Sequence, residues 1–198
     1  NFWNGSIDEV RIYNRALSAD EIAKLYQLTT PTGVDTSLKG YWSFDGQYTT
    51  TTSGANAGTK DVSGNNNWAT FSGGVQPVGG MVGQAVKFDG VDDYVDMGNP
   101  ASLNFGNNNF SISAWIKTSD NTTRQGIVDK HETSAASLGG YILETGFTDG
   151  NIRFAVVSNG PSQGFIDVAA NYADNSWHNI VAIRNGSGTT LYFDGVLI

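Results

Sequence analysis

The chain has 198 residues, no cysteine and a formal net charge of −8, with 11 Lys and Arg against 19 Asp and Glu. The absence of cysteine excludes disulfides, thiolate zinc sites and a cysteine nucleophile. The negative charge disfavours nucleic acid as a partner. No apolar run approaches the roughly 20 residues of a membrane-spanning helix, so we expect no membrane insertion.

The first stretch alternates like a β-strand. Over residues 6–13 the sequence SIDEVRIY places successive side chains on opposite faces if the segment is extended. The alternation predicts one face with Ile7, Glu9, Arg11 and Tyr13, and the other with Asp8, Val10 and Ile12.

A short helix is predicted directly after this strand. The run Ser18-Ala19-Asp20-Glu21 is a capping box, in which Ser18 accepts from the Glu21 amide and Glu21 reaches back to Ser18. The helix should continue to about Tyr26 and bury Ile22, Leu25 and Tyr26 on one side.

The rest of the chain has the pattern of many short strands. Residues 28–37 are polar, contain Pro and Gly and are interpreted as a linker. Two strands around Asp89-Gly90 predict a hairpin, and a second pair is predicted around the turn at 185–188. Further strands are expected at 38–45, 110–117, 125–130, 140–144, 151–157 and 163–168.

Several motifs resemble one family. The opening run FWNGSIDEVRIYNRALSADEIAKLY, the strand LKGYWSFD at 38–45, the turn DVSGNNN at 61–67 and the run GQAVKFDGVDDYVDMG at 83–98 are similar to a laminin-G-like domain of the concanavalin A-like lectin/glucanase superfamily. The resemblance implies an all-β, jelly-roll sandwich of two antiparallel sheets, with one short helix near the N-terminus.

The order of these motifs differs from the family's order. Residues 1–27 resemble the closing strand and helical turn of a domain, whereas 38–198 resemble its first nine-tenths without one or two strands before the close. Residues 1–27 could therefore complete the same chain as a circular permutation, exchange strands with a neighbouring copy, or belong to a preceding repeat. We favour the first arrangement, because a linker of about ten residues spans ~30 Å; residues 1–27 and 38–198 would then form one domain.

Calcium is the expected cofactor. Oxygen donors occur in or near predicted turns, and calcium takes six to eight oxygen ligands. The resemblance implies a structural calcium where the first and last strands of the domain meet. Carried over to this chain, it implicates Asp8, Asp45, Asp61 and Asn66, while Asp89, Asp92 and Asp93 are further donors.

Aromatic and polar residues suggest a carbohydrate site. A sugar ring stacks on an exposed aromatic side chain, and polar groups fix its hydroxyls. The ligand-binding candidates are Trp68, Tyr141, Arg153 and Tyr172, with Trp3 as a further aromatic. For each aromatic, burial in the core is the alternative interpretation.

No catalytic pattern accompanies these candidates. Glucanases that share the fold carry paired carboxylates on one strand in the pattern E-x-D-x-x-E, which is absent here. We therefore expect a non-catalytic, secreted or cell-surface recognition module for glycan or an extracellular protein, within a larger or tandem-repeat protein. The alternatives are a structural or adhesive spacer without a small ligand and, third, a fragment of a glycan-degrading enzyme.

Overall fold

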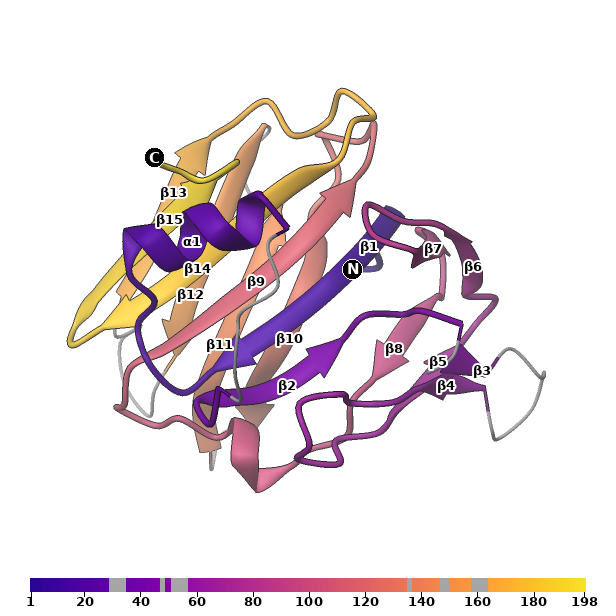
Figure 1. The fold of residues 1–198 in the computed structure, drawn as a ribbon. Coiled ribbons are helices and arrows are strands. Elements are labelled where there is room, and N and C mark those ends of the chain that lie inside the picture. Colours follow the sequence, from indigo (N-terminus) through magenta and orange to yellow (C-terminus); the bar gives the residue numbers. More distant parts are fainter. Residues whose placement is uncertain (29–34, 47–48, 51–56, 135–136, 147–149, 158–163) are drawn as a thin grey trace.

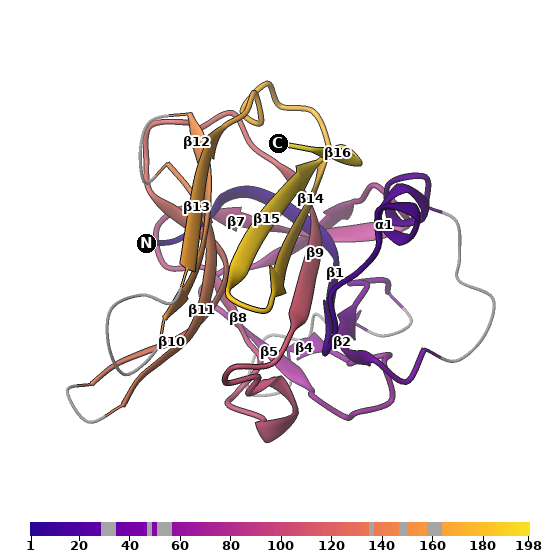
Figure 2. The same cartoon turned by 90° about the vertical axis from the view of Figure 1, so that its left-hand side faces the viewer.

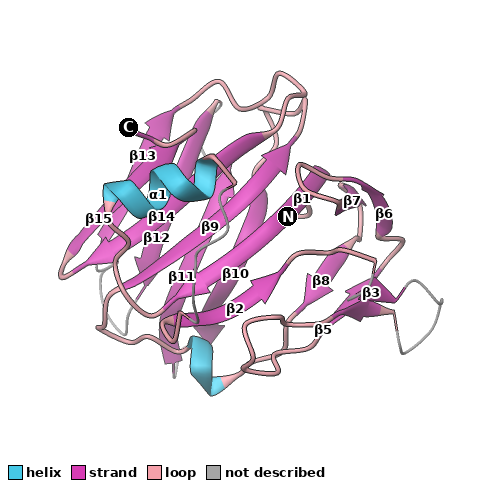
Figure 3. Cartoon of the chain, viewed as in Figure 1, coloured by secondary structure: helices cyan, strands magenta, loops and turns pink. Residues whose placement is uncertain are grey.

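The computed structural model describes residues 1–28, 35–46, 49–50, 57–134, 137–146, 150–157 and 164–198. Most of the linker predicted at 28–37 lies outside these ranges, as does the first residue of the strand predicted at 163–168. The described residues form antiparallel strands, one α-helix, α1 (Ala19–Tyr26), and one 3₁₀ turn, η1 (Ala101–Leu103) (Figure 3).

One large sheet forms the first layer of the molecule (Figure 1). Its strands follow the order β16 (Val196–Leu197), β15 (Gly188–Phe193), β14 (His178–Asn185), β9 (Phe110–Lys117), β1 (Asn4–Tyr13), β7 (Gln84–Asp89) and β6 (Gln76–Gly79), and β2 (Leu38–Trp42) also pairs with β1.

Two smaller sheets form the second layer (Figure 2). The first has the order β10 (Gln125–Ser134), β11 (Ser137–Thr145), β12 (Asn151–Val157) and β13 (Gly164–Ala169), and the second has the order β3 (Thr49–Thr50), β4 (Gly58–Thr59), β5 (Ala69–Ser72) and β8 (Tyr94–Asp96). Side chains from all three sheets enter one apolar core. The predicted all-β sandwich with one short helix is confirmed.

Strand β1 lies at the centre of the large sheet. Along one edge it pairs with β9; along the other its first half pairs with β7 and its second half with β2. The segment that resembles the family's closing strand therefore has three partner strands from its own chain.

A β-bulge interrupts β1, and it corrects the predicted faces. The register with β9 shifts between Asp8 and Arg11, and Glu9 has a φ of +55°. A bulge inserts one extra residue and so changes which side the following residues face. As a result Ile7 enters the core together with Val10 and Ile12, although simple alternation had placed it with Glu9.

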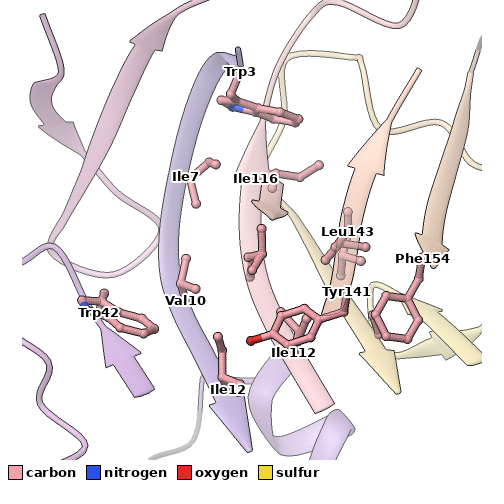
Figure 4. Packing of buried hydrophobic residues seen from close by; sticks show 14 of the residues in the cluster. Trp3, Ile7, Val10, Ile12, Trp42, Ile112, Ile116, Tyr141, Leu143 and Phe154 are labelled. Atoms are coloured by element: carbon pink, nitrogen blue, oxygen red, sulfur yellow. The ribbon is translucent and has the colours of Figure 1, made fainter. Parts of the chain in front are cut away.

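The main core lies between the two layers. Figure 4 shows Ile7, Val10 and Ile12 of β1 on the side of the large sheet, with Tyr141, Leu143 and Phe154 across from them. Trp42 of β2 is fully buried and donates its indole N–H to the Asn67 carbonyl at 2.9 Å. The strand predicted at 110–117 is confirmed as β9, and its alternate residues Phe110, Ile112, Ala114 and Ile116 belong to this core.

Helix α1 covers the opposite face of the large sheet. The predicted capping box is present, with Ser18 Oγ accepting from the Glu21 amide and Glu21 Oε2 accepting from the Ser18 amide at 2.9 Å. Ile22 and Leu25 pack against Val181 and Ile183 of β14 together with Tyr13 and Leu17. Tyr26, predicted to be buried, is 41% exposed and stacks on Trp115 of β9 at 5.7 Å between ring centroids.

The hairpin predicted around Asp89-Gly90 is wrong. Strand β7 is paired on both edges, with β1 and β6, so β8 cannot add to it and pairs with β5 in the second layer. The Asp93 carboxylate accepts from the Asp89 amide at 2.9 Å and from the Gly74 amide, which fixes this crossing between layers. The second predicted hairpin is confirmed as β14 and β15, joined at Asn185 and Gly188.

Candidate calcium and carbohydrate sites

Two of the predicted metal ligands lie against one glycine turn. Asp8 Oδ2 accepts from the Val82 amide, and Asp45 Oδ1 accepts from the Gln84 amide, each at 3.0 Å. A Cβ at Gly80 would lie 2.5 Å from Asp8 Oδ2, and one at Gly83 would lie 2.0 Å from Asp45 Oδ1. Only glycine allows the turn to approach the carboxylates this closely.

Asp8 is a buried carboxylate that is only partly hydrogen-bonded. Its side chain is fully buried, and Oδ1 has no hydrogen-bond partner among the described residues. Burial, together with the nearby Glu9 charge, raises the pKa of Asp8 to about 7, although the Val82 amide acts in the opposite direction. A buried anion with an unused oxygen is costly unless a cation or a proton compensates it.

The neighbouring charges do not supply that compensation. Arg11 forms a short ion pair with Glu9, and the Tyr41 hydroxyl donates to both Glu9 oxygens at 2.9 and 3.0 Å. The Arg11 guanidinium also lies 4.3 Å from the Tyr41 ring centroid. This cation therefore pairs with Glu9, whereas the described contacts of Asp8 are the hydrogen bond from the Val82 amide and the close approach of Gly80.

The other two predicted metal ligands lie in a different turn. Asp61 Oδ1 accepts from the amides of Tyr41 and Ser63, at 2.9 and 2.8 Å. Its Oδ2 accepts from the backbone amide and the side-chain amide of Asn67, at 3.1 and 3.0 Å. Asn66 is exposed with a φ of +58°. Asp61 thus shapes the turn, and none of these hydrogen bonds involves Asp8.

Three further acids form a second cluster. Carboxylate oxygens of Asp89, Asp92 and Asp93 lie within 4.8 Å of one another. The Asp93 carboxylate accepts hydrogen bonds from backbone amides, as described above, and Asp89 Oδ1 accepts from the Val91 amide at 2.8 Å. These hydrogen bonds hold the connection that runs from β7 in one layer to β8 in the other. They explain why the three acids lie together, and they leave a local negative charge there.

A polar groove of about 540 Å³ lies where β1 ends and β9 begins. It is lined by Asn14, Arg15, Ser102, Asn104, Phe105, Asn107, Asn108 and Asn109. We call it the asparagine groove. Carboxamides both donate and accept hydrogen bonds, so this lining can match hydroxyl groups of either orientation.

The asparagine groove carries little net charge. Its cation, Arg15, donates to the two Glu21 oxygens at 2.8 and 2.7 Å and to Asp35 at 3.1 Å. The hydrogen bond from Arg15 lowers the pKa of Glu21 to about 2, so this carboxylate stays ionised and balances the guanidinium. A neutral, hydroxylated ligand fits such a surface better than an ion does.

The predicted ligand-binding residues are dispersed. Tyr141 and Tyr172 are buried in the core at 3% and 0% exposure, and Trp3 is also buried. Arg153 lies on β12 with its guanidinium 5.3 Å from the Phe165 ring centroid. Trp68 is 46% exposed and follows Asn67, whose Oδ1 accepts from Ser102 on the groove wall at 3.1 Å.

The asparagine groove was not predicted from the sequence. Its visible signal was the run of asparagines at 107–109. That run meets Asn14 only because β1 pairs with β9 across about a hundred residues, with Tyr13 opposite Ser111.

The family model described as "Concanavalin A-like lectin/glucanases superfamily" matches residues 1–23 and 89–198, which is more than half of the chain. The chain belongs to this superfamily. The match has two separate blocks, one of which contains β1 and the other β9. A comparison with curated proteins gave no significant match.

One solved structure gives a significant match, the crystal structure of the binding domain of Paraclostridial Mosquitocidal Protein 1. It has a TM-score of 0.53 and 20% sequence identity, over 71% of this chain and 36% of that chain. At this identity the likeness shows the fold alone, and this chain spans about a third of the length of that protein. In the described part of the chain, no helix is long and apolar enough to cross a membrane.

Proposed function

We propose that this superfamily member is a non-catalytic carbohydrate-binding module that takes a neutral saccharide in the asparagine groove. The observation that carries the proposal is the groove itself, which is lined by five asparagines, a charge-balanced arginine and Phe105. Trp68 has an exposed indole and directly follows Asn67, whose side chain accepts a hydrogen bond from Ser102 on the groove wall. The absence of the glucanase E-x-D-x-x-E pattern from the sequence supports a binding role.

The module is further proposed to carry one structural calcium at Asp8. Asp8 Oδ1 and the Asp45 carboxylate would hold the ion, together with oxygens of the Gly80–Gln84 turn. When bound, calcium supplies positive charge for a buried carboxylate and ties β1 to the start of β7. The unused, buried Asp8 oxygen supports this assignment.

The carbohydrate proposal is tested with an array of neutral oligosaccharides, followed by calorimetry on the best binder. Asn107→Ala combined with Asn108→Ala is expected to weaken binding at least tenfold, because both exposed carboxamides line the groove. Asn171→Ala, which removes an exposed asparagine outside the groove, should leave affinity unchanged. Equal affinity of the two variants would place the sugar elsewhere, and no binding by the array would favour the spacer alternative.

The calcium proposal is tested by thermal unfolding with calcium and with EDTA. Calcium should raise the Tm of the wild type, and Asp8→Asn should abolish that increase, because the substitution removes the carboxylate charge. Asp20→Asn, on the exposed first turn of α1, should respond as the wild type does. A calcium response that survives Asp8→Asn would assign the ion to another site.

The proposed setting is outside the cell, as a recognition unit of a larger protein that contacts glycan or an extracellular protein. Membership of the superfamily supports this setting. Surface labelling of the full-length protein in its native host would test it; strong labelling is expected, and labelling no higher than that of a cytoplasmic marker would contradict it.

A further inference from the structure

The hairpin of β14 and β15 has its tip beside the start of β9 (Figure 1). Asn185 pairs with Gly188, so the loop of the hairpin consists of residues 186–187. Gly186 has a φ of +62°, as the tight turns of two-residue hairpin loops require at this position. Residues 185–188 are all exposed. The hairpin tip therefore presents an Asn-Gly step to water.

An exposed Asn-Gly step is chemically reactive. The Gly186 amide nitrogen loses its proton to a base and attacks Cγ of Asn185, and the side-chain nitrogen takes up a proton and leaves as ammonia. Water then opens the five-membered succinimide ring at one of its two carbonyl carbons, which gives aspartate or isoaspartate. The net reaction consumes one water and releases one ammonia. Glycine favours the attack, because no side chain shields its nitrogen.

One side chain holds both reacting groups of this step. The Gly186 amide donates to Asn109 Oδ1 at 2.7 Å, and Asn109 Nδ2 donates to Asn185 Oδ1 at 3.1 Å. A carboxamide has one acceptor oxygen and two N–H donors, so Asn109 makes both hydrogen bonds at once. The first keeps the proton on the nitrogen that attacks, and the second fixes the carboxamide that is attacked. We call this arrangement the Asn109 clamp.

A second bridge joins the hairpin tip to the asparagine groove. The Arg184 guanidinium donates to the Gly186 carbonyl at 3.1 Å and to the Gly106 carbonyl at 2.6 Å. Arg184 is buried, and a charged donor forms stronger hydrogen bonds than a neutral one. Gly106 and Asn109 flank residues 107–108, which line the groove. The groove loop, residues 106–109, is thus attached to the hairpin tip at both of its ends.

Modification of Asn185 would act on both attachments. An isoaspartate adds one carbon to the main chain, so a two-residue loop no longer matches the pairing of Asn185 with Gly188. The change also displaces the amide and the carbonyl of Gly186, which bind Asn109 and Arg184. The groove loop would then lose its hydrogen bonds to the hairpin.

We propose that Asn185 is a site of spontaneous modification to aspartate and isoaspartate, and that the Asn109 clamp holds this reaction back. Opening of the clamp frees the Gly186 nitrogen and starts the reaction, and an isoaspartate product releases the groove loop from the hairpin tip. The reaction goes beyond the proposed carbohydrate binding and is tested without a saccharide, so each proposal can fail alone.

The rate of modification is measured by peptide mapping and mass spectrometry on the intact chain during incubation at mildly alkaline pH. The reference is a synthetic peptide of residues 181–189, which lacks the clamp. The wild-type chain should convert Asn185 at least tenfold more slowly than the peptide, because two hydrogen bonds must open before the nitrogen attacks. Asn109→Ala should convert Asn185 at least fivefold faster than the wild type.

Another Asn-Gly step gives an internal control in the same digest. Asn4-Gly5 lies in β1, and the Asn4 amide donates to Gln125 Oε1 at 2.6 Å. Its rate of modification should be the same in the wild type and in Asn109→Ala. An equal increase at both steps would assign the effect to general unfolding and would overturn the role of the clamp. Equal rates of Asn185 conversion in the wild type and the free peptide would do so as well.

A matched variant and a second measurement complete the test. Asn108→Ala removes the neighbouring exposed carboxamide of the groove loop and should leave the rate at Asn185 unchanged; a rate as high as that of Asn109→Ala would contradict the clamp. Chains with isoaspartate at position 185, separated by ion exchange, should exchange the backbone amides of residues 106–109 at least fivefold faster than fresh chains. Unchanged exchange would show that the groove loop does not depend on the hairpin tip.

Discussion

The two faces of the large sheet, which has β1 at its centre, are covered by different kinds of element. On the outer face α1 covers β14 and β9, Ile22 is fully buried, and Tyr26 closes over Trp115. On the inner face the second layer covers most of the core but leaves a cavity of about 560 Å³ between β8 and β10, above Ile7, Val10 and Ile12. Among the described residues, β8 and β10 each pair with another strand on one side only. A helix satisfies its own backbone hydrogen bonds, but a sheet edge can be satisfied only by another strand.

The strongest test of this comparison removes the element that both sides share. Deletion of residues 1–27 takes away the central strand, its three pairings and the covering helix. We expect the shortened chain to lose its cooperative unfolding transition and near-ultraviolet circular dichroism, while the full chain sediments as a monomer.

Two results would contradict that expectation. A folded deletion variant would make residues 1–27 dispensable, as for a remnant of a preceding repeat. A full chain that dimerises with concentration, but not after the deletion, would indicate that β1 is exchanged between copies.

A pair of matched truncations measures the difference between the two sides. Ile22→Ala is expected to cost about 2–5 kcal/mol, because it creates a cavity beneath the helix at a fully buried position. Ile127→Ala, in the wall of the cavity between β8 and β10, should cost less than about 1 kcal/mol, because its partly buried side chain already borders a cavity. Urea unfolding of both variants provides the comparison, and equal costs would show that the cavity wall is as closely packed as the helix side.

The outer side was the more predictable from sequence. The capping box at Ser18 and Glu21 and the inward pattern of β9 are local signals that each fix one element. The resemblance identified residues 1–27 as a closing strand and helical turn, but the central position of β1 in the large sheet was not predicted, because no local pattern specifies which strands will be neighbours.

The wrong predictions share one physical cause, which is the pairing of strands that are far apart in the sequence. The bulge at Glu9 reverses the face of Ile7, and neither period-two alternation nor composition reveals it. The Asp89-Gly90 turn has hairpin chemistry, yet β1 and β6 occupy both edges of β7 and send β8 to the other layer. The candidate sites depend on the same pairings: Asp8 and Asp45 were predictable as oxygen donors, but the asparagine groove and the cavity between β8 and β10 were not.

A pH experiment tests the protonation of Asp8, which lies where the bulge of β1 contacts the glycine turn. The folded-state pKa of Asp8, raised to about 7, exceeds the ~3.9 of an unfolded Asp. Its contribution to stability is therefore fully present below about pH 4 and is lost as pH rises through about 7. In EDTA, the wild type should lose about 2–3 kcal/mol more than Asp8→Asn does between pH 5 and pH 8.

Calcium should reverse this loss of stability at high pH. The ion binds the carboxylate and not the acid, so adding calcium at pH 8 should restore most of the lost stability in the wild type alone. Urea unfolding at the two pH values, with and without calcium, measures both effects. Parallel pH profiles for wild type and Asp8→Asn would mean that the Asp8 carboxyl is compensated in another way.

The smallest expected effect concerns the cap of α1. Ser18→Ala removes the side-chain acceptor for the Glu21 amide and should cost about 1 kcal/mol. Because α1 covers only the outer face, this loss should add to that of Ile127→Ala on the inner face. Urea unfolding of the two single variants and of the double variant tests both statements. A double variant whose loss differs from the sum of the single losses would show that the two sides are coupled through β1.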